Sequence, residues 1–179
     1  MEVSSHALAQ HRCQTIQFDA AIFTNLSRDH LDYHVDMADY AAAKRRLFTD
    51  YAPAFAVINH DDELGKKWFG ELNGGMQMLS FGLHKGAELS AEVLCMDTNG
   101  MAIRIDGPWG TEEFHTCLLG EFNASNLLAT AGTLALLGMP WSKVLHQLEI
   151  MQPVPGRMMR LGGGLGQPVV VVDYAHTPD

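Results

Sequence analysis

The sequence has few cysteines and no long hydrophobic run, and each shortage excludes a class of protein. The three cysteines (Cys13, Cys95 and Cys117) are too few and too far apart for a disulfide framework or a zinc site. They fit a reducing compartment, so we expect a cytoplasmic protein. The longest uncharged stretch, residues 122–142, contains Asn, Ser, Thr, Gly and Pro, which favours a buried helix with a turn over a membrane span.

Positive charge is also scarce in this sequence. Twelve Lys and Arg residues face 21 Asp and Glu residues, which gives a formal net charge of −9. A protein that binds nucleic acid through the phosphate backbone needs a basic surface, so we expect no nucleic-acid partner. The hydrophobic content of 47% excludes a disordered chain, and 179 residues suffice for a core without disulfides or a structural metal.

Short apolar segments alternate with helical patterns in the first half of the chain. Residues 20–24 and 54–58 are typical of buried parallel strands. A helix over 37–51, capped by Asp36, and a helix over 61–72 follow them. This βαβα alternation predicts an α/β fold with a mostly parallel sheet flanked by helices.

The pattern changes after residue 86. Residues 87–119 contain two turn sequences, at 97–100 and 107–110, and predict a small antiparallel three-stranded sub-sheet. A helix over 123–137 and another from Pro140 come next.

The last segment of the chain mixes turn residues with one strand pattern. Residues 153–156 are typical of an interdomain linker, and 162–164 of a loop or hairpin turn. The valine run over 169–172 has the pattern of a buried parallel strand. A buried strand so close to Asp179, and a motif-like segment at Met1, lead us to expect a piece of a longer chain.

The densest polar cluster, residues 27–34, follows the first predicted strand. Ligands of α/β proteins lie beyond the carboxyl ends of parallel strands, and the Asp and His side chains here suit Mg²⁺, Mn²⁺ or Zn²⁺. A polar loop with an ordinary helix cap explains the same residues. A metal hydrolase built on Asp29, His30, Asp32 and His34 is a further alternative, but it leaves Lys44 and the two asparagines described below unexplained.

Lys44 stands on the apolar stripe of the helix predicted over 37–51. A buried lysine is rare because burial disfavours the charged amine. Such a lysine can act as a nucleophile or react with CO₂ to give a carbamate, which is an anionic oxygen ligand. It can also extend its amine to the surface at the edge of the stripe. The composition of the sequence does not decide among these three roles for Lys44.

Four more residues are candidates for nucleotide contacts. Asn123 and Asn126 lie one turn apart at a helix start, where they can cap the helix or bind a purine edge. Arg157 and Asp173 are candidates for phosphate and ribose contacts. No G-x-x-x-x-G-K-[S/T] phosphate loop occurs in the chain.

Taken in order, the motifs of this sequence resemble those of the Mur ligases. The segments are MEVSSH at 1–6, TNLSRDHLDYH at 24–34, YAAAK at 40–44, NHDD at 59–62, GEFNASN at 120–126, PGR at 155–157 and DYAHTPD at 173–179. The resemblance covers essentially the whole chain and is weakest across the antiparallel strands. The string over 27–34 points to the family member that adds the third residue of the peptidoglycan stem.

The resemblance implies an ATP-dependent amide ligase. In this reading ATP phosphorylates the D-Glu of UDP-MurNAc-L-Ala-D-Glu, and a diamino acid then attacks the acyl phosphate. meso-Diaminopimelate is favoured over lysine. Residues 1–154 would be part of the central ATP-binding domain, with its phosphate loop upstream of Met1. Residues 155–179 would be the linker and first strand of the C-terminal domain, and the piece alone would be inactive.

The resemblance also implies roles for single residues. Glu2 and His30 match Mg²⁺ ligands, and Lys44 matches a lysine whose carbamate binds a second Mg²⁺. Three positions match contacts to the UDP-linked substrate: Ser4, Gln10 and Arg12. Four match contacts to ATP: Asn123, Asn126, Arg157 and Asp173. The full-length protein is expected to be a monomer with no membrane partner. A folylpolyglutamate- or cyanophycin-type ligase, or a non-catalytic remnant, are the alternatives.

Overall fold

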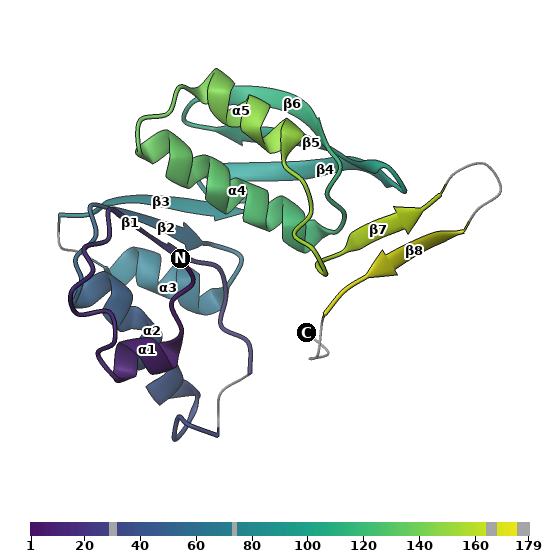
Figure 1. Ribbon diagram of the computed structural model, residues 1–179. Helices are drawn as coiled ribbons and strands as arrows, with labels where there is room; N and C mark the ends of the chain where they lie inside the picture. The colour runs from purple at the N-terminus through teal and green to yellow at the C-terminus, as the bar shows by residue number, and fades with distance from the viewer. Residues whose placement is uncertain (29–31, 73–74, 164–167, 175–179) are drawn as a thin grey trace.

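The computed structural model of the chain describes residues 1–28, 32–72, 75–163 and 168–174. Figure 1 shows a layered α/β body, with a two-stranded hairpin formed by the last strands beside it. In chain order the elements are α1 (Ser5–Ala9), β1 (Ala20–Phe23), α2 (Met37–Thr49), β2 (Phe55–Asn59), α3 (Glu63–Glu71), β3 (Gln77–Gly82), β4 (Leu89–Asp97), β5 (Gly100–Gly107), β6 (Gly110–Thr116), α4 (Glu121–Leu136), α5 (Trp141–Ile150), β7 (Met159–Gly162) and β8 (Val169–Val172).

The main sheet has six strands in the order β1-β2-β3-β4-β5-β6. Strands β1 to β4 pair in parallel, and β4, β5 and β6 pair antiparallel. The predicted mostly parallel sheet with an antiparallel three-stranded part is therefore confirmed. The two parts are joined where Phe81 and Gly82 of β3 pair with Leu89 and Ser90 of β4. The antiparallel strands thus continue the parallel sheet.

Strand β3 is an inner strand that the sequence pattern did not predict. Its apolar run is interrupted by Ser80, which is only 1% exposed. Glu88 compensates: its carboxylate accepts hydrogen bonds from the Ser80 backbone N–H (2.9 Å) and hydroxyl (3.2 Å). The Glu88 N–H in turn donates to the Ser80 hydroxyl oxygen at 2.9 Å. A buried serine is tolerated in the sheet because a side chain from the next loop completes its hydrogen bonds.

Both faces of strand β2 are buried, each against a different helix layer. Along β2, Val57 packs into the cluster that contains the buried side of α4 and α5. Its neighbours Ala56 and Ile58 point the other way and pack against Phe48 of α2 and Trp68 of α3. Figure 1 shows the two layers on opposite sides of the sheet. Burial on both faces explains why β2 is continuously apolar, whereas Ile22 of the edge strand β1 is 40% exposed.

The helix ends follow the capping signals in the sequence. Asp36 caps α2 by accepting a hydrogen bond from the Asp39 N–H at 2.8 Å, as predicted. Asp62 caps α3 through the N–H groups of Leu64 and Gly65. The predicted helices extend one or two residues beyond the observed ones at some ends, which is ordinary for a pattern-based boundary. The short helix α1 was not predicted.

The valine run forms a strand, as predicted, but its pairing differs from the predicted parallel one. Strand β8 pairs antiparallel with β7, not in a parallel sheet. Val170 is 50% exposed and Val171 44% exposed, so the run is not buried among the described residues. Only six residues, 163–168, separate the two strands in the sequence, which allows antiparallel pairing without a crossover. The proposed boundary after residue 154 stays a prediction.

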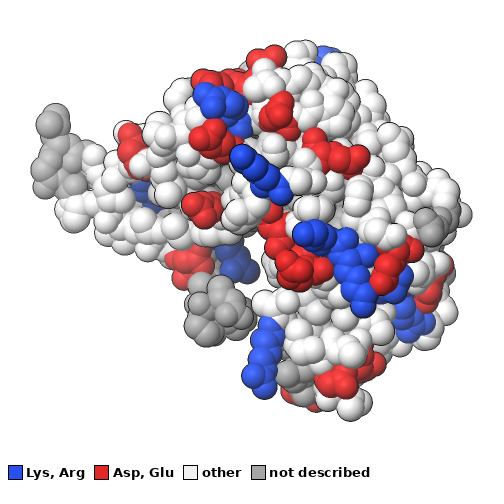
Figure 2. All heavy atoms as spheres, turned by 180° about the vertical axis from the view of Figure 1, so that it is seen from behind, with Lys and Arg blue, Asp and Glu red and all other residues white. Residues whose placement is uncertain are grey.

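Charged side chains are mixed on the surface. On the face that Figure 2 shows, Lys and Arg lie interspersed with Asp and Glu instead of forming one basic stripe. Within the described ranges, no helix combines the length and the apolar character needed to cross a membrane.

Candidate active site

A cavity of about 640 Å³ lies between the first turns of α4 and the segment that follows α5. All four residues expected to contact ATP line it: Asn123, Asn126, Arg157 and Asp173. Its remaining wall is mostly apolar and includes Leu118, Phe122, Leu127, Met151, Pro153 and Val154. An apolar cavity with a few converging polar groups is suited to a flat heteroaromatic ring with a polar edge.

The two asparagines of the cavity differ in how firmly they are held. Asn123 donates through its side-chain amide to the Leu119 carbonyl at 2.8 Å, so its position is fixed and its amide oxygen can still accept. Asn126 lies one turn later on α4 and is exposed. Asn123 therefore supports the helix start as well as lining the cavity, and Asn126 is the better isolated probe of ligand binding.

The opposite wall depends on a glycine in a strained loop. Gly156 has φ = +78°, and a Cβ at this position would lie 2.1 Å from the Tyr174 ring. The Tyr174 N–H donates to the Gly156 carbonyl at 2.8 Å. The Asp173 carboxylate accepts from the Met158 N–H at 2.9 Å, and Met158 has φ = +45°. Asp173 thus holds the loop that carries Arg157, a role that sequence reasoning missed.

A second group of contacts orders the chain beyond the carboxyl end of β1. The Asn59 side chain donates to the Thr24 carbonyl at 2.6 Å. The Asp62 carboxylate accepts from the Leu26 N–H at 2.9 Å while it caps α3. The NHDD motif at 59–62 therefore fixes the segment that leads into the polar cluster. Adjacent parallel strands make this possible because their carboxyl ends lie at one edge of the sheet.

The described part of the structure does not show the three expected metal ligands as a group. His30 lies outside the residues that the structure describes, and Glu2 is exposed near the start of the chain. Across the described ranges, no group of three or more His, Cys, Asp or Glu side chains could hold a metal ion. The metal-hydrolase alternative gains no support either, because Asp29 and His30 lie outside the residues that the structure describes. The magnesium ligands stay a prediction.

Lys44 is half-buried on α2, less than its place on the apolar stripe led us to expect. Its Nζ atom lies 5.4 Å from the centre of the Tyr40 ring, a cation–π distance. Its two arginine neighbours pair elsewhere, Arg45 with Glu71 at 3.2 Å and Arg46 with Asp50 at 2.8 Å.

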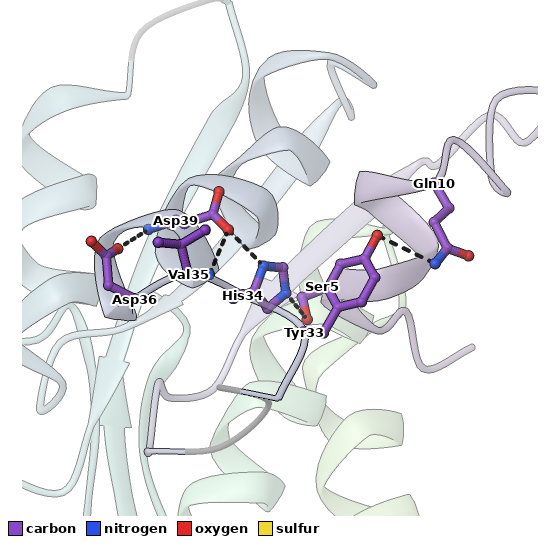
Figure 3. Close-up of polar contacts among 7 residues, drawn as sticks. All are labelled: Ser5, Gln10, Tyr33, His34, Val35, Asp36 and Asp39. Atoms are coloured by element: carbon purple, nitrogen blue, oxygen red, sulfur yellow. Dashed lines mark hydrogen bonds and ion pairs between the residues drawn. The ribbon is translucent and has the colours of Figure 1, made fainter.

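The residues expected to bind the UDP-linked substrate lie just before and just after α1, and all three are exposed. Ser4 caps α1 by accepting from the Ala7 N–H at 3.2 Å, which leaves its hydroxyl hydrogen to donate. Gln10 donates through its side-chain amide to the Tyr33 hydroxyl at 3.3 Å (Figure 3). Arg12 follows on the same segment. Ser4, Gln10 and Arg12 thus share one short segment of the chain.

Beneath these residues is a polar network that the sequence did not reveal. His34 is 3% exposed and Ser5 is 1% exposed. The His34 ring contacts the Ser5 hydroxyl through Nε2 at 2.9 Å and the Asp39 carboxylate through Nδ1 at 3.2 Å. Figure 3 shows the imidazole between α1 and the start of α2. No linear spacing signals this contact, since Ser5 and His34 are 29 residues apart.

One shifted pKa lies at the other end of α2. Arg46, and after it Thr49, donate hydrogen bonds to the Asp50 carboxylate and hold the pKa of Asp50 below its usual value. The Arg46 guanidinium also lies 3.3 Å from the His11 ring, just after α1. These exposed contacts join α1 and α2 at the surface, whereas the His34 network joins them in the interior.

Comparison with known proteins gives a consistent result. The sequence profile of the Mur ligase middle domain matches residues 1–134. A UDP-N-acetylmuramoyl-L-alanyl-D-glutamate–2,6-diaminopimelate ligase of Xanthomonas oryzae pv. oryzae is 47% identical over 181 aligned residues, covering 100% of this chain and 37% of its own length. The ligase of the same name from Alkalilimnicola ehrlichii is 45% identical and covers 99% of this chain and 36% of its own length.

The solved structures agree with the sequence relatives. A structure of a UDP-N-acetylmuramoyl-L-alanyl-D-glutamate–2,6-diaminopimelate ligase superimposes with a TM-score of 0.84 and 32% identity, over 99% of this chain and 37% of that chain. A MurF ligase from Thermotoga maritima in complex with ADP shares the fold, with a TM-score of 0.73 and 18% identity over 85% of this chain and 35% of its own. The chain spans just over a third of the length of these relatives.

Proposed function

Since this chain belongs to the Mur ligase middle-domain family, we propose that it is the ATP-binding part of an ATP-dependent amide ligase. The proposed reaction adds a diamino acid, meso-diaminopimelate, to the D-Glu of UDP-MurNAc-L-Ala-D-Glu. The substrate assignment follows the names of relatives that are 45% and 47% identical to this chain. We call the proposed longer protein that contains this chain the complete ligase.

The observation that carries the proposal is the gathering of four separate motif residues around one cavity. Asn123 and Asn126 come from α4, whereas Arg157 and Asp173 come from the loop and strand end that follow α5. In the proposed complex the asparagine amides bind the purine edge. The Arg157 guanidinium then faces phosphate oxygens, for which its fork of N–H donors is suited. Asp173 holds the loop and accepts from a ribose hydroxyl.

The substrate side of the proposal involves the exposed segment around α1. Ser4 and Gln10 offer a hydroxyl and an amide, and Arg12 offers a cation to the anionic UDP-linked substrate. Gln10 is held by Tyr33, which orients its amide before a ligand arrives. Prearranged donors of this kind lower the entropy cost of binding.

The proposed metal is Mg²⁺: Glu2 and His30 would hold one ion, and the carbamate of Lys44 would help to hold a second. Two of these three ligands are anionic oxygen donors, which is the chemistry that Mg²⁺ prefers. When bound, the metal would neutralise the charge that gathers on the transferring phosphoryl group. Carbamate formation requires the Lys44 amine to lose a proton before its nitrogen attacks CO₂.

The proposed chemistry has two steps. A γ-carboxylate oxygen of D-Glu attacks the γ-phosphorus of ATP, and ADP leaves. The amine of the diamino acid then attacks the acyl carbon, loses a proton, and phosphate departs as the amide forms. The described residues contribute binding and orientation: the cavity holds the nucleotide, and the α1 segment holds the UDP-linked acid. We propose that the 179-residue chain alone does not ligate, because it spans only 37% of its relatives and lacks a phosphate-loop motif.

A kinetic experiment on the complete ligase tests the proposal. ADP release is measured with Mg-ATP, UDP-MurNAc-L-Ala-D-Glu and meso-diaminopimelate, and again with lysine or a folate substrate. We expect turnover with the first set. We also expect Asn126→Ala to raise the KM for ATP roughly tenfold, the size of one lost hydrogen bond to a ligand, without changing the KM for the UDP-linked substrate.

The matched control is Gln77→Ala, which removes an exposed amide at the start of β3, outside the cavity. It should leave both KM values unchanged. A folded complete ligase that releases no ADP with this substrate pair would refute the proposed function. Turnover with a folate instead would favour a related ligase, and turnover with lysine would correct the amino acid alone.

A further inference from the structure

His34 is a buried imidazole with a hydrogen-bond partner on each nitrogen, and none of the proposed reaction steps uses it. A carboxylate only accepts hydrogen bonds, so the contact with Asp39 assigns the proton to Nδ1. In the neutral form of the ring, Nε2 is then an acceptor, and the Ser5 hydroxyl at 2.9 Å can donate to it. The Asp39 carboxylate also accepts from the Val35 N–H at 3.3 Å. Figure 3 shows the ring enclosed between these partners.

The order Ser-His-Asp invites comparison with a hydrolytic triad, but burial argues against that role. Ser5 is 1% exposed and His34 is 3% exposed, so no substrate carbonyl can reach the serine hydroxyl. The same burial makes the network a strong positional constraint. Asp39 is 53% exposed, but removing His34 leaves the buried Ser5 hydroxyl without its partner, which costs more than losing a surface hydrogen bond.

The network connects the two groups of proposed functional residues. On one side, Ser5 adjoins Ser4, and Tyr33, the neighbour of His34 in the chain, holds Gln10. On the other side, the His34 ring stacks on Tyr40, with centroids 5.2 Å apart and planes 22° apart. Tyr40 is the residue whose ring lies 5.4 Å from Lys44 Nζ. A short series of contacts thus leads from α1 to Lys44.

From these contacts we propose that His34 is a positioning residue that fixes the substrate-binding side chains of α1 relative to Lys44 on α2. This inference rests on the proposed function for the identity of the substrate, a UDP-linked acid. Without the imidazole, α1 loses its hydrogen-bonded tie to the start of α2. Ser4 and Gln10 then sample positions that do not match the substrate.

The first test measures amide hydrogen exchange on the 179-residue chain and needs no activity. His34→Phe keeps a ring in the cavity but removes both hydrogen bonds. We expect faster exchange over residues 8–12 and unchanged exchange within α4. The matched control is His115→Phe on strand β6, an exposed histidine far from α1 in the fold. Ser5→Ala, a smaller change, should give a smaller increase in the same amides.

The second test uses the complete ligase. His34→Phe should raise the KM for the UDP-linked substrate roughly tenfold and leave the KM for ATP unchanged. Simple loss of folded enzyme would lower the apparent kcat and change neither KM. His34→Asn, which can still donate to Asp39, should restore part of the loss. Adding Ser5→Ala to His34→Phe should change little, because both act on one network.

The outcomes separate the two proposals. Unchanged exchange in His34→Phe and Ser5→Ala, or faster exchange with both KM values unaltered, overturns the positioning role. Faster exchange over residues 8–12 together with the KM split supports it. A wild-type complete ligase without turnover overturns the proposed function, and with it the substrate named here. The exchange measurement still decides whether His34 ties α1 to α2.

Discussion

The nucleotide cavity and the α1–α2 region are built in opposite ways. The cavity collects single residues from distant segments: α4 supplies two amides, and the loop before β7 and the end of β8 supply a guanidinium and a carboxylate. The α1–α2 region presents exposed side chains from short neighbouring segments, supported by the buried His34 network. The cavity therefore depends on long-range packing and backbone conformation, and the α1–α2 region depends on a few buried hydrogen bonds.

This difference predicts how substitutions affect each region. A substitution in the loop at Gly156 should displace several cavity residues together, because Asp173 and Tyr174 both form hydrogen bonds to that loop. A substitution in the α1–α2 region should displace fewer groups, but Lys44 is one of them. The predictions below test this contrast, from the largest expected effect to the smallest.

The largest effect is expected at Lys44. Lys44→Ala in the complete ligase should lower kcat by roughly 10²–10³-fold, the typical loss when one charge-stabilising group at a reaction centre is removed. The KM for ATP should change little, because Lys44 does not line the nucleotide cavity. Steady-state kinetics measure this, and ¹³C NMR after exposure to ¹³CO₂ detects the carbamate. Lys66→Ala, an exposed lysine on α3, is the control. Normal turnover of Lys44→Ala would remove the carbamate role.

The next effect compares two glycines with similar backbone angles. Gly156 has φ = +78° and Gly138 has φ = +90°, but only Gly156 has an atom, in the Tyr174 ring, within reach of an added Cβ. We expect Gly138→Ala to cost about 1 kcal/mol of stability with an unchanged KM for ATP. Gly156→Ala should displace the cavity wall and raise the KM for ATP at least roughly tenfold. Equal kinetics in the two variants would mean that the loop does not shape the site.

The smallest effect concerns Asp50, at the exposed edge of the α1–α2 region. The pKa of Asp50 is lowered in the folded state, chiefly by its hydrogen bond to Arg46. Its contribution to stability is therefore present above the unfolded pKa and lost as pH falls through the folded pKa. Because the carboxylate is 43% exposed, solvent screens the pair, and we expect about 0.3–0.5 kcal/mol at pH 7.

Thermal unfolding measures this contribution. Asp50→Asn should lower Tm by about 1–2 °C at pH 7, and the difference should shrink at high salt and vanish below the folded pKa. A difference that grows toward acid pH would contradict the assignment. If Asp50→Asn lowered Tm at pH 7 as much as His34→Phe does, the surface contacts and not the buried network would join α1 to α2.

Much of the fold was predictable from local patterns. Strands β1 and β2 were predicted because both are short, continuously apolar runs, and α2 was predicted because Asp36 caps it before an amphipathic stripe. Strand β3 was missed because a buried serine interrupts its apolar pattern. The hydrogen-bond partner that makes this burial possible, Glu88, lies in the next loop. The valine run was assigned to a buried parallel strand because composition is the same for both kinds of pairing.

The sequence by itself determined the alternation of strands and helices, the identity of the motif residues and the family. Each of these follows from spacing and residue type, which a linear chain displays. Only the tertiary structure decided that Asn126, Arg157 and Asp173 line one cavity, and that His34 joins Ser5 to Asp39. The physical reason is that hydrogen bonds and burial depend on distance in space. Ser5 and His34 are 29 residues apart in the chain, yet their side chains lie 2.9 Å apart.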